Sequence, residues 1–319
     1  MVSLLPGRAR RSSEAEGKLT TMFYRQKNQL QRWWFARNIR SVLNTPPLGL
    51  GGGAAPAVLS QLQHKDVLMY LAAVKSFARH LLPGEVHVVD DGSLTEADHA
   101  LLEQHIPGIQ FHELAKYREP GLPQGGCWER LIAIARLSQT RYTIQLDSDT
   151  LTLAHVSEVA SAVQLGRSFA IGTWDKQKIE SAIERARTAQ SRIEGTRPHV
   201  QLLAEANFDR FQDAAALKYV RGCAGFSGFA PGAGKIELMR SLSGQMQALI
   251  GERWLEWGSE QVMSNLVVAN QADAIVLPHP GYADCEKMRQ GTTRFVHFIG
   301  TCRFRDGRYA RLVNQVFNA

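Results

Sequence analysis

Two carboxylates that stand two residues apart are the strongest chemical feature of this sequence. Asp147 and Asp149 directly follow residues 142–146, whose β-branched and apolar side chains are typical of a short buried strand. In an extended chain residues i and i+2 point to the same side, where two carboxylates repel each other unless a cation or a hydrogen-bond network lies between them. Mg²⁺ and Mn²⁺ prefer oxygen ligands, so the pattern indicates a divalent cation that joins the protein to a phosphorylated substrate. A strand-end turn, where Asp and Ser are also favoured, is the alternative.

Alternating strands and helices lead up to this pair of carboxylates. Strands are expected at residues 57–62, 85–89, 109–112 and 142–146, with helices between them that begin at Asp66, at a Ser93–Glu96 capping box and at Trp128. This order predicts an α/β fold with a mixed, mostly parallel sheet and helices on both faces. Ligands bind beyond the carboxyl ends of the strands in such sheets. Four carboxylates are expected on that rim: Asp90, Asp91, Asp147 and Asp149.

The second half of the chain is less regular. It predicts helices at residues 155–165, 176–192, 236–250 and 259–270, and strands at residues 169–172 and 274–277. Residues 219–231 are small and glycine-rich, which lets another chain or a ligand approach the backbone closely. A phosphate loop is excluded at residues 228–235, because the glycine spacing is one residue too long and Ile236 replaces the required Ser or Thr.

Charge is concentrated at the N-terminus. Residues 1–45 hold nine Lys/Arg and two Asp/Glu, whereas the rest of the chain holds 28 of each. The basic character therefore belongs to an arm and not to the main body, which argues against a nucleic-acid partner. Residues 1–18 are expected to be disordered, and residues 19–43 to form a basic helix with Trp33 and Trp34. This helix could lie on an anionic membrane surface, or pack on its own domain or on a second subunit.

Glycine and proline in residues 44–56 mark a domain boundary. We expect a basic N-terminal arm and linker over residues 1–50 and a catalytic domain over residues 51–319. Within this domain residues 55–155 would bind the donor and residues 156–319 the acceptor. The four cysteines show no pairing or zinc spacing, and no stretch is apolar enough for a secretory signal or a bilayer span. These features predict reduced thiols and a cytoplasmic protein, either free or peripheral to the inner face of the membrane; they leave the oligomeric state open.

Taken together, four segments resemble the glycosyltransferases of the GT-A (Rossmann-like) fold. The matching segments are residues 90–93 (Asp-Asp-Gly-Ser), 147–149 (Asp-Ser-Asp), 257–261 (Trp-Gly-Ser-Glu-Gln) and 297–300 (His-Phe-Ile-Gly). The resemblance covers about residues 55–305 and rests on the order and spacing of the segments. It implies a nucleotide-sugar donor, in the first instance a UDP-sugar, and a carbohydrate, lipid-linked or protein acceptor.

The resemblance also implies roles for individual residues. Asp90 or Asp91 would bind the base or ribose of the donor. Asp149 would bind the metal directly, Asp147 would bind the ribose, the metal or a metal-bound water, and His297 would complete the metal site. A histidine ligand favours Mn²⁺ over Mg²⁺. A core histidine between Val296 and Phe298 is the alternative for His297.

Two further residues could serve the chemistry. Arg130 could contact the diphosphate, as could the tail arginines Arg303, Arg305 and Arg308; a surface charge is the alternative for Arg130. Glu260 stands where inverting relatives keep the base that activates the acceptor hydroxyl. Its alternative is a glutamate favoured in the first turn of a helix by the dipole. Gln261, where a second acid is frequent, departs from the inverting pattern, and the stereochemistry stays open.

Two other functions compete with glycosyl transfer. A nucleotidyltransferase also needs clustered carboxylates and Mg²⁺, but it usually carries a glycine-rich basic loop after its first strand, and residues 61–65 contain no glycine. A non-catalytic scaffold of the same fold could use its tryptophan-rich arm to bind a partner. A complete metal site formed by Asp149 and His297 would argue against the scaffold.

Overall fold

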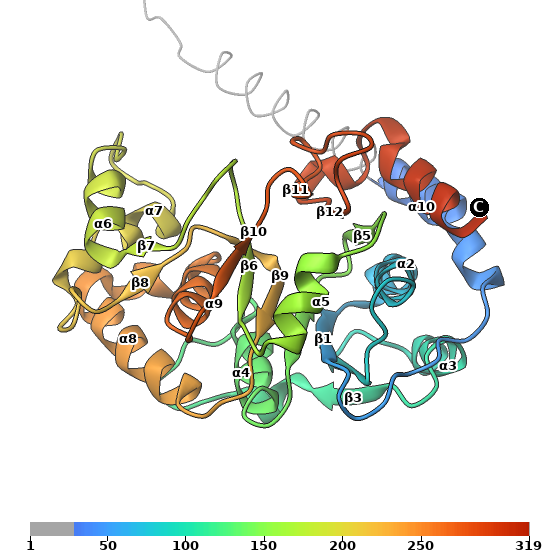
Figure 1. Ribbon diagram of the computed structural model, residues 1–319, viewed down its shortest axis with the longest axis horizontal. Coiled ribbons are helices and arrows are strands. Elements are labelled where there is room, and N and C mark those ends of the chain that lie inside the picture. The colour runs from blue at the N-terminus through green and yellow to red at the C-terminus, as the bar shows by residue number, and fades with distance from the viewer. Residues whose placement is uncertain (1–28, 319) are drawn as a thin grey trace, which may run out of the picture.

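A seven-stranded sheet runs through the centre of the protein, of which the computed structural model describes residues 29–318 (Figure 1). The strand order is β10-β6-β9-β4-β1-β2-β3, and only the pairs that β9 makes with β4 and β6 are antiparallel. The expected mixed, mostly parallel sheet is therefore confirmed. Its strands are β1 (Ala57–Leu62), β2 (Glu85–Asp90), β3 (Gln110–Glu113), β4 (Thr143–Leu146), β6 (Phe169–Ile171), β9 (Cys223–Phe229) and β10 (Ile275–Leu277).

Helices cover both faces of this sheet. Neighbouring residues of β1 face opposite sides, because Val58 belongs to one hydrophobic core with α2, and Leu59 to a second core with α4 and α9. Figure 1 shows α2 and α3 at one end of the molecule and α6 and α8 at the other. The helices are α2 (Val67–Ala78), α3 (Glu96–His105), α4 (Trp128–Leu137), α5 (Ser157–Gln164), α6 (Ala182–Gln190), α7 (Val200–Glu205), α8 (Lys235–Ile250), α9 (Ser259–Ala269) and α10 (Arg308–Asn318).

A small sheet stands beside the main one and carries the C-terminal part of the chain. It has the order β11-β12-β5, formed by β11 (Tyr282–Asp284), β12 (Phe295–His297) and β5 (Thr150–Thr152). β12 runs antiparallel to β5, with His297 opposite Thr150. A two-residue ladder joins β7 (Glu180–Ser181) to β8 (Lys218–Tyr219). Short 3₁₀ turns occupy Arg40–Asn44, His64–Asp66, Leu114–Tyr117, Phe208–Arg210, Gly251–Leu255, Gly300–Arg303 and Arg305–Gly307.

The described part of the N-terminal arm packs on the body of the protein. Residues 29–38 are helical, and Phe35, Ile39 and Val42 are buried in the core that α2 and α10 share. Trp33 on the same helix stays 62% exposed. The predictions for residues 1–18 and for residues 19–28 lie outside the described residues, and the division at residue 50 stays a prediction. Among the described helices, none combines the length and hydropathy that a bilayer crossing requires.

Three local predictions of helix starts are wrong. The capping box before α3 is formed by Thr95 and Asp98, because the Asp91 carboxylate already accepts both the N–H and the O–H of Ser93. Asp66 precedes α2 without a side-chain capping bond. The helix expected over residues 176–192 is limited to Ala182–Gln190, because the two residues before it pair as β7 with β8 and Ser181 caps the helix.

The cysteines also differ from the expectation of four reduced thiols. Cys285 and Cys302 form a disulfide, while Cys127 and Cys223 are free. No spacing rule could indicate this pair, since the two residues meet only because β12 runs parallel to β11, which brings the turn after β12 to the carboxyl end of β11. The disulfide ties the end of β11 to the residue just before Arg303.

Candidate metal and donor site

The Asp147–Asp149 turn is fixed on all sides by hydrogen bonds to its backbone. The N–H of Asp147 donates to the carbonyl of Gly225 on β9 at 2.9 Å, and the Thr150 hydroxyl donates to the Asp147 carbonyl at 2.8 Å. From α10, the Tyr309 hydroxyl donates to the carbonyl of Thr150 at 3.1 Å. The turn therefore follows a buried strand directly, and its two carboxylates are held in place by the main sheet and the C-terminal helix.

His297 reaches this turn through the small sheet. Its pairing opposite Thr150 is extended by the N–H of Phe298, which donates to the Asp149 carbonyl at 2.8 Å. The ring Nε2 atom then lies 3.0 Å from Oδ1 of Asp149 and 4.0 Å from Oδ2 of Asp147. The side chain is buried, but it faces two carboxylates rather than the apolar core, so the alternative of a simple core histidine does not describe it.

The position of the His297 ring explains why residue 225, in the glycine-rich stretch, is a glycine. A Cβ atom on Gly225 would lie 2.1 Å from Cε1 of His297, closer than any real contact. The ring thus packs on bare backbone in the middle of β9. Any other residue at this position would have to displace the histidine.

Asp147, Asp149 and His297 form the one group of potential metal ligands found among residues 29–318. One ligand atom from each lies within 4.8 Å of the other two. Two carboxylate oxygens and one imidazole nitrogen at this spacing fit a divalent cation such as Mn²⁺, with positions left over for substrate oxygens. The structure brings together the three residues named as metal ligands from the sequence.

Two arginines flank the carboxylates. A guanidinium nitrogen of Arg130 lies 2.5 Å from Oδ1 of Asp147, and the other terminal nitrogen lies 3.3 Å from Oε1 of Glu260. Nε of Arg303 lies 3.1 Å from Oδ2 of Asp149. Arg130 is buried, so the alternative of a surface charge is wrong. It joins the first carboxylate of the turn to the carboxylate on α9.

The two aspartates differ in their ionisation. Burial raises the pKa of Asp147, and the charge of Asp149 adds to this against the opposing charge of Arg130. Burial would also raise the pKa of Asp149, but His297 and Arg303 outweigh it and hold this pKa below its usual value. Burial would lower the pKa of His297, yet Cys223 and Asp149 raise it well above the ordinary range. In the absence of a cation, the charges of Arg130, Arg303 and His297 therefore oppose those of the two aspartates.

Glu260 lies in the first turn of α9, behind Arg130. Gly258 precedes the helix in the left-handed conformation, and Ser259 accepts a hydrogen bond from the Trp128 indole at 2.9 Å. Burial raises the pKa of Glu260 to about 7, which Arg130 opposes and Asp147 reinforces. The carboxylate is 6% exposed and belongs to the same charged cluster as the Asp147–Asp149 turn.

Asp90 and Asp91 stay outside this cluster in the contacts of the described residues. Asp90 accepts from the N–H of Gly92 at 2.8 Å and contacts His99 at 3.2 Å. Oδ1 of Asp91 accepts from the N–H and the hydroxyl of Ser93. Both residues lie at the carboxyl end of β2, two strands away from β4 across the sheet, as expected. Their carboxylates organise the loop after β2.

The sequence assigned no role to two residues of the site and only a general one to a third. Cys223, whose Sγ lies 3.0 Å from Nδ1 of His297, and Tyr309 had no assigned role. Arg303 was considered only as one of three tail arginines for the diphosphate. Only the glycine-rich composition around Cys223 signalled that a side chain would pack against this backbone.

Comparisons with known proteins found likenesses among solved structures. No family model matches the chain, and no curated protein sequence does. The bifunctional glycosyltransferase WbbM is 12% identical with a TM-score of 0.48; the match covers 86% of this chain but 53% of WbbM, so the chain spans about half of that protein. Mouse xyloside xylosyltransferase 1 is 12% identical with a TM-score of 0.40, and covers 78% of this chain and 99% of its own. The galactosyltransferase LgtC, solved with donor and acceptor sugar analogues, is 9% identical with a TM-score of 0.42, at 82% and 95% coverage. The solved structures to which this chain is similar are thus glycosyltransferases, and the likeness is one of fold.

Proposed function

We propose that this chain is a glycosyltransferase that moves a sugar from a nucleotide-sugar, in the first instance a UDP-sugar, to an acceptor hydroxyl. The observation that carries the proposal is the meeting of Asp147, Asp149 and His297 at the carboxyl end of a central strand. Two of these residues stand two positions apart in the sequence, but the third comes from a strand 148 positions after Asp149. A strand-end turn needs no such partner, whereas a cation site does.

A divalent cation held there would act as a Lewis acid that offsets the negative charge developing on the departing nucleoside diphosphate. Asp147, Asp149 and His297 would hold it, and the imidazole favours Mn²⁺ over Mg²⁺. Arg303 lies beside Asp149 at the rim with its side chain 25% exposed, where it could turn toward the diphosphate. Asp90 and Asp91 would bind the base or ribose of the donor from the neighbouring loop.

Glu260 is the proposed general base. A carboxylate whose pKa lies near 7 can accept a proton from an acceptor hydroxyl at neutral pH and release it afterwards. Arg130 contacts both Glu260 and Asp147, so it would fix the base relative to the donor site. This role requires an inverting reaction, and NMR of the anomeric proton in the product would test it.

The experiment that tests the proposal is a measurement of UDP release from a panel of UDP-sugars with Mn²⁺. We expect turnover that is lost with EDTA and reduced at least 100-fold in Asp149→Asn and Asp147→Asn, a size typical of removing electrostatic stabilisation from a transition state. Asp213→Asn, which changes an exposed aspartate, is the matched control and should keep full activity.

The two competing functions predict other results in the same assay. A nucleotidyltransferase would release pyrophosphate from a nucleoside triphosphate and a sugar phosphate, with no UDP from a UDP-sugar. A scaffold would show no turnover and no thermal stabilisation by UDP and Mn²⁺ together. Either result, reproduced across donors with other nucleotides, would contradict glycosyl transfer.

A further inference from the structure

The two nitrogens of His297 face different partners. Nε2 points to the carboxylates of Asp149 and Asp147, and Nδ1 lies 3.0 Å from Sγ of Cys223. A ring nitrogen that binds a cation carries no proton, so a neutral imidazole must then keep its proton on the other nitrogen. A cation at Nε2 of His297 therefore requires a hydrogen-bond acceptor next to Nδ1. The sulfur atom of Cys223 occupies that place.

We propose that Cys223 is a positioning residue of the cation site. Its Sγ accepts a hydrogen bond from Nδ1 of His297, and this bond directs the unprotonated Nε2 toward Asp147 and Asp149. Partners of this kind orient the rings of metal-binding histidines in many proteins, and their loss weakens metal binding by about 10–100-fold. The inference rests on the proposed function, since it concerns the same site.

The backbone around Cys223 is fixed for such a role. Cys223 begins β9 where its pairing with β6 shifts register, between Ala170 and Ile171. The carbonyl of Gly222 accepts from the side-chain amide of the buried Asn265 at 2.9 Å. Asn265 on α9 thus anchors the backbone directly before Cys223.

The ring itself is bounded on three sides. Cys223 lies at Nδ1, Asp149 at Nε2, and the backbone of Gly225 against the ring face. A flip of the imidazole would place Cδ2 beside the sulfur and Cε1 beside the carboxylates, so both contacts of the ring nitrogens would be lost. The geometry therefore selects one orientation of His297 before any cation binds.

A thiol, an imidazole and a carboxylate in a row also resemble the arrangement of a cysteine nucleophile. In such a triad a single carboxylate orients the ring. Here Asp149 also contacts Arg303, and a second carboxylate, Asp147, lies 4.0 Å from Nε2. These additional groups have no role in thiol chemistry, whereas they are the expected surroundings of a cation.

The test is a titration of the full chain with Mn²⁺ in the absence of nucleotide, in which electron paramagnetic resonance reports free Mn²⁺. Cys223→Ala removes the acceptor and should weaken binding about 10–100-fold. Cys223→Ser keeps an acceptor in nearly the same place and should stay within about threefold of the wild type, because only the reach of the side chain shortens. Ser227→Ala, which removes from the same strand a buried hydroxyl that has no hydrogen-bond partner, is the matched control and should bind as the wild type does.

A second measurement reports directly which nitrogen of the His297 ring carries the proton. Nitrogen-15 NMR of labelled histidine with Mg²⁺, assigned with His297→Gln, should place the proton of His297 on Nδ1 in the wild type. In Cys223→Ala the signal should move toward a mixture of both tautomers. A merely structural role of Cys223 would lower the melting temperature without changing this distribution.

The possible outcomes separate this inference from the proposed function. Equal Mn²⁺ affinity in the wild type and a folded Cys223→Ala would overturn the role of Cys223 while leaving the site intact. Equal loss of affinity in Cys223→Ala and Ser227→Ala would overturn it as well. A wild type that binds no Mn²⁺, or an Asp149→Asn variant that binds it equally well, would overturn the proposed site itself.

Discussion

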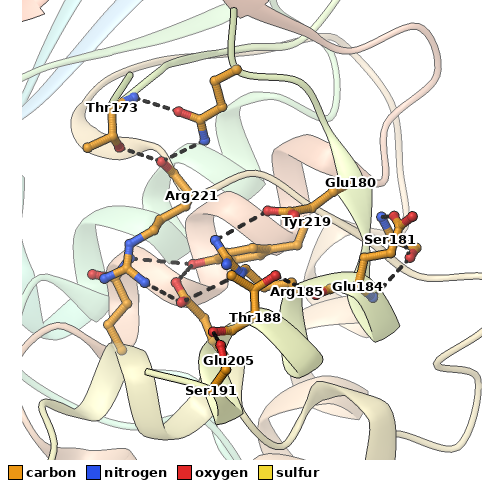
Figure 2. Close-up of polar contacts among 12 residues, drawn as sticks. Thr173, Glu180, Ser181, Glu184, Arg185, Thr188, Ser191, Glu205, Tyr219 and Arg221 are labelled. Atoms are coloured by element: carbon orange, nitrogen blue, oxygen red, sulfur yellow. Dashed lines mark hydrogen bonds and ion pairs between the residues drawn. The ribbon is translucent and has the colours of Figure 1, made fainter. Parts of the chain in front are cut away.

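Two clusters of charged side chains with buried centres within residues 29–318 are built differently. The site cluster joins Asp147, Asp149 and Glu260 to Arg130, Arg303 and His297. The second, which we call the Glu205 cluster, lies between α6, α7 and β8 and joins Glu180 and Glu205 to Arg185, Arg221 and Tyr219 (Figure 2). Both have a buried centre, with Arg130 and Asp149 in one and Arg185 and Glu205 in the other.

The difference lies in where the carboxylate oxygens point. In the Glu205 cluster each oxygen faces a donor: Oε1 of Glu205 accepts from the Tyr219 hydroxyl at 3.0 Å, and Oε2 contacts Arg221 and, at 4.0 Å, Arg185 (Figure 2). In the site cluster, oxygens of Asp147 and Asp149 converge on a common point beside His297. The site oxygens also contact Arg130, His297 and Arg303, but one ligand atom from each of Asp147, Asp149 and His297 lies within 4.8 Å of the other two. Among residues 29–318, the site cluster alone groups potential metal ligands in this way, and it is there that the proposed cation would bind.

The largest expected effect is on the Glu205 cluster. Glu205→Ala leaves Arg185, which is 2% exposed, and Arg221 without their shared partner. Removing one member of a buried ion pair typically costs about 3–5 kcal/mol. We expect a loss of this size in the free energy of unfolding, measured by urea denaturation, with Mn²⁺ affinity unchanged in the fraction that stays folded. Asp149→Asn should do the reverse, losing Mn²⁺ binding at a smaller cost in stability. If both variants lost stability equally, the distinction between the clusters would fail.

Because of Glu260, the free energy of unfolding should depend on pH. The folded-state pKa of Glu260, about 7, lies above the unfolded value of 4.5, so the folded state binds the extra proton between these two values. Glu260 therefore lowers stability as pH rises through that window, by up to about 3 kcal/mol from the pKa difference. The advantage of wild type over Glu260→Gln should grow by about 2–3 kcal/mol from pH 8 to pH 5 in EDTA, measured by urea denaturation. A difference that is flat with pH would show that Arg130 keeps Glu260 ionised throughout.

A substitution at Gly225 should disturb the site locally, with a smaller loss in the free energy of unfolding. Gly225→Ala places a methyl group where the ring of His297 lies, so the ring must move. Overpacking of this kind typically costs about 1–3 kcal/mol, and we expect Mn²⁺ binding to fall with it. Gly244→Ala is the control: it lies within α8 with open space around its Cβ position, and should stabilise the protein by up to about 1 kcal/mol. Unchanged Mn²⁺ affinity in Gly225→Ala would mean that His297 does not hold the cation.

The sequence predicted the central strands and the three residues of the candidate metal site from recognisable short motifs. The apolar run before Asp147, the helical spacing that leads to α2 and the order of the motifs are readable from neighbouring residues. Even His297 was found, since its motif follows the others in a familiar order. The fold class followed from the alternation of these elements alone.

What the sequence could not predict depends on partners distant in the chain. The contact of Cys223 with His297 joins residues 74 positions apart, and the placement of β9 antiparallel in the middle of a parallel sheet brings them together. The disulfide of Cys285 and Cys302 and the burial of Arg130 between two carboxylates arise in the same way. The helix expected at residues 176–192 is shorter because β7 pairs with β8, and no local sequence pattern predicts this pairing.

The smallest expected effect compares the arginines at the rims of the two clusters, Arg303 and Arg221, whose side chains are 25% and 26% exposed. Arg221→Ala removes a charged hydrogen bond from the fully buried Glu205 and should cost about 1.5–3 kcal/mol. Arg303→Ala leaves Asp149 paired with His297 and should cost less, within about 1 kcal/mol.

Their effects on metal binding should differ in sign as well as in size. Because Arg303 competes with a cation for Oδ2 of Asp149, its removal should tighten Mn²⁺ binding in the absence of nucleotide by up to about fivefold, the equivalent of about 1 kcal/mol. Arg221→Ala should leave the affinity unchanged, since the Glu205 cluster holds no converging acceptors. Mn²⁺ titrations of both variants, followed by electron paramagnetic resonance, measure this directly. Weaker binding in Arg303→Ala would show that Arg303 supports the carboxylates instead of competing for them, and that converging acceptors alone do not distinguish a binding cluster from a structural one.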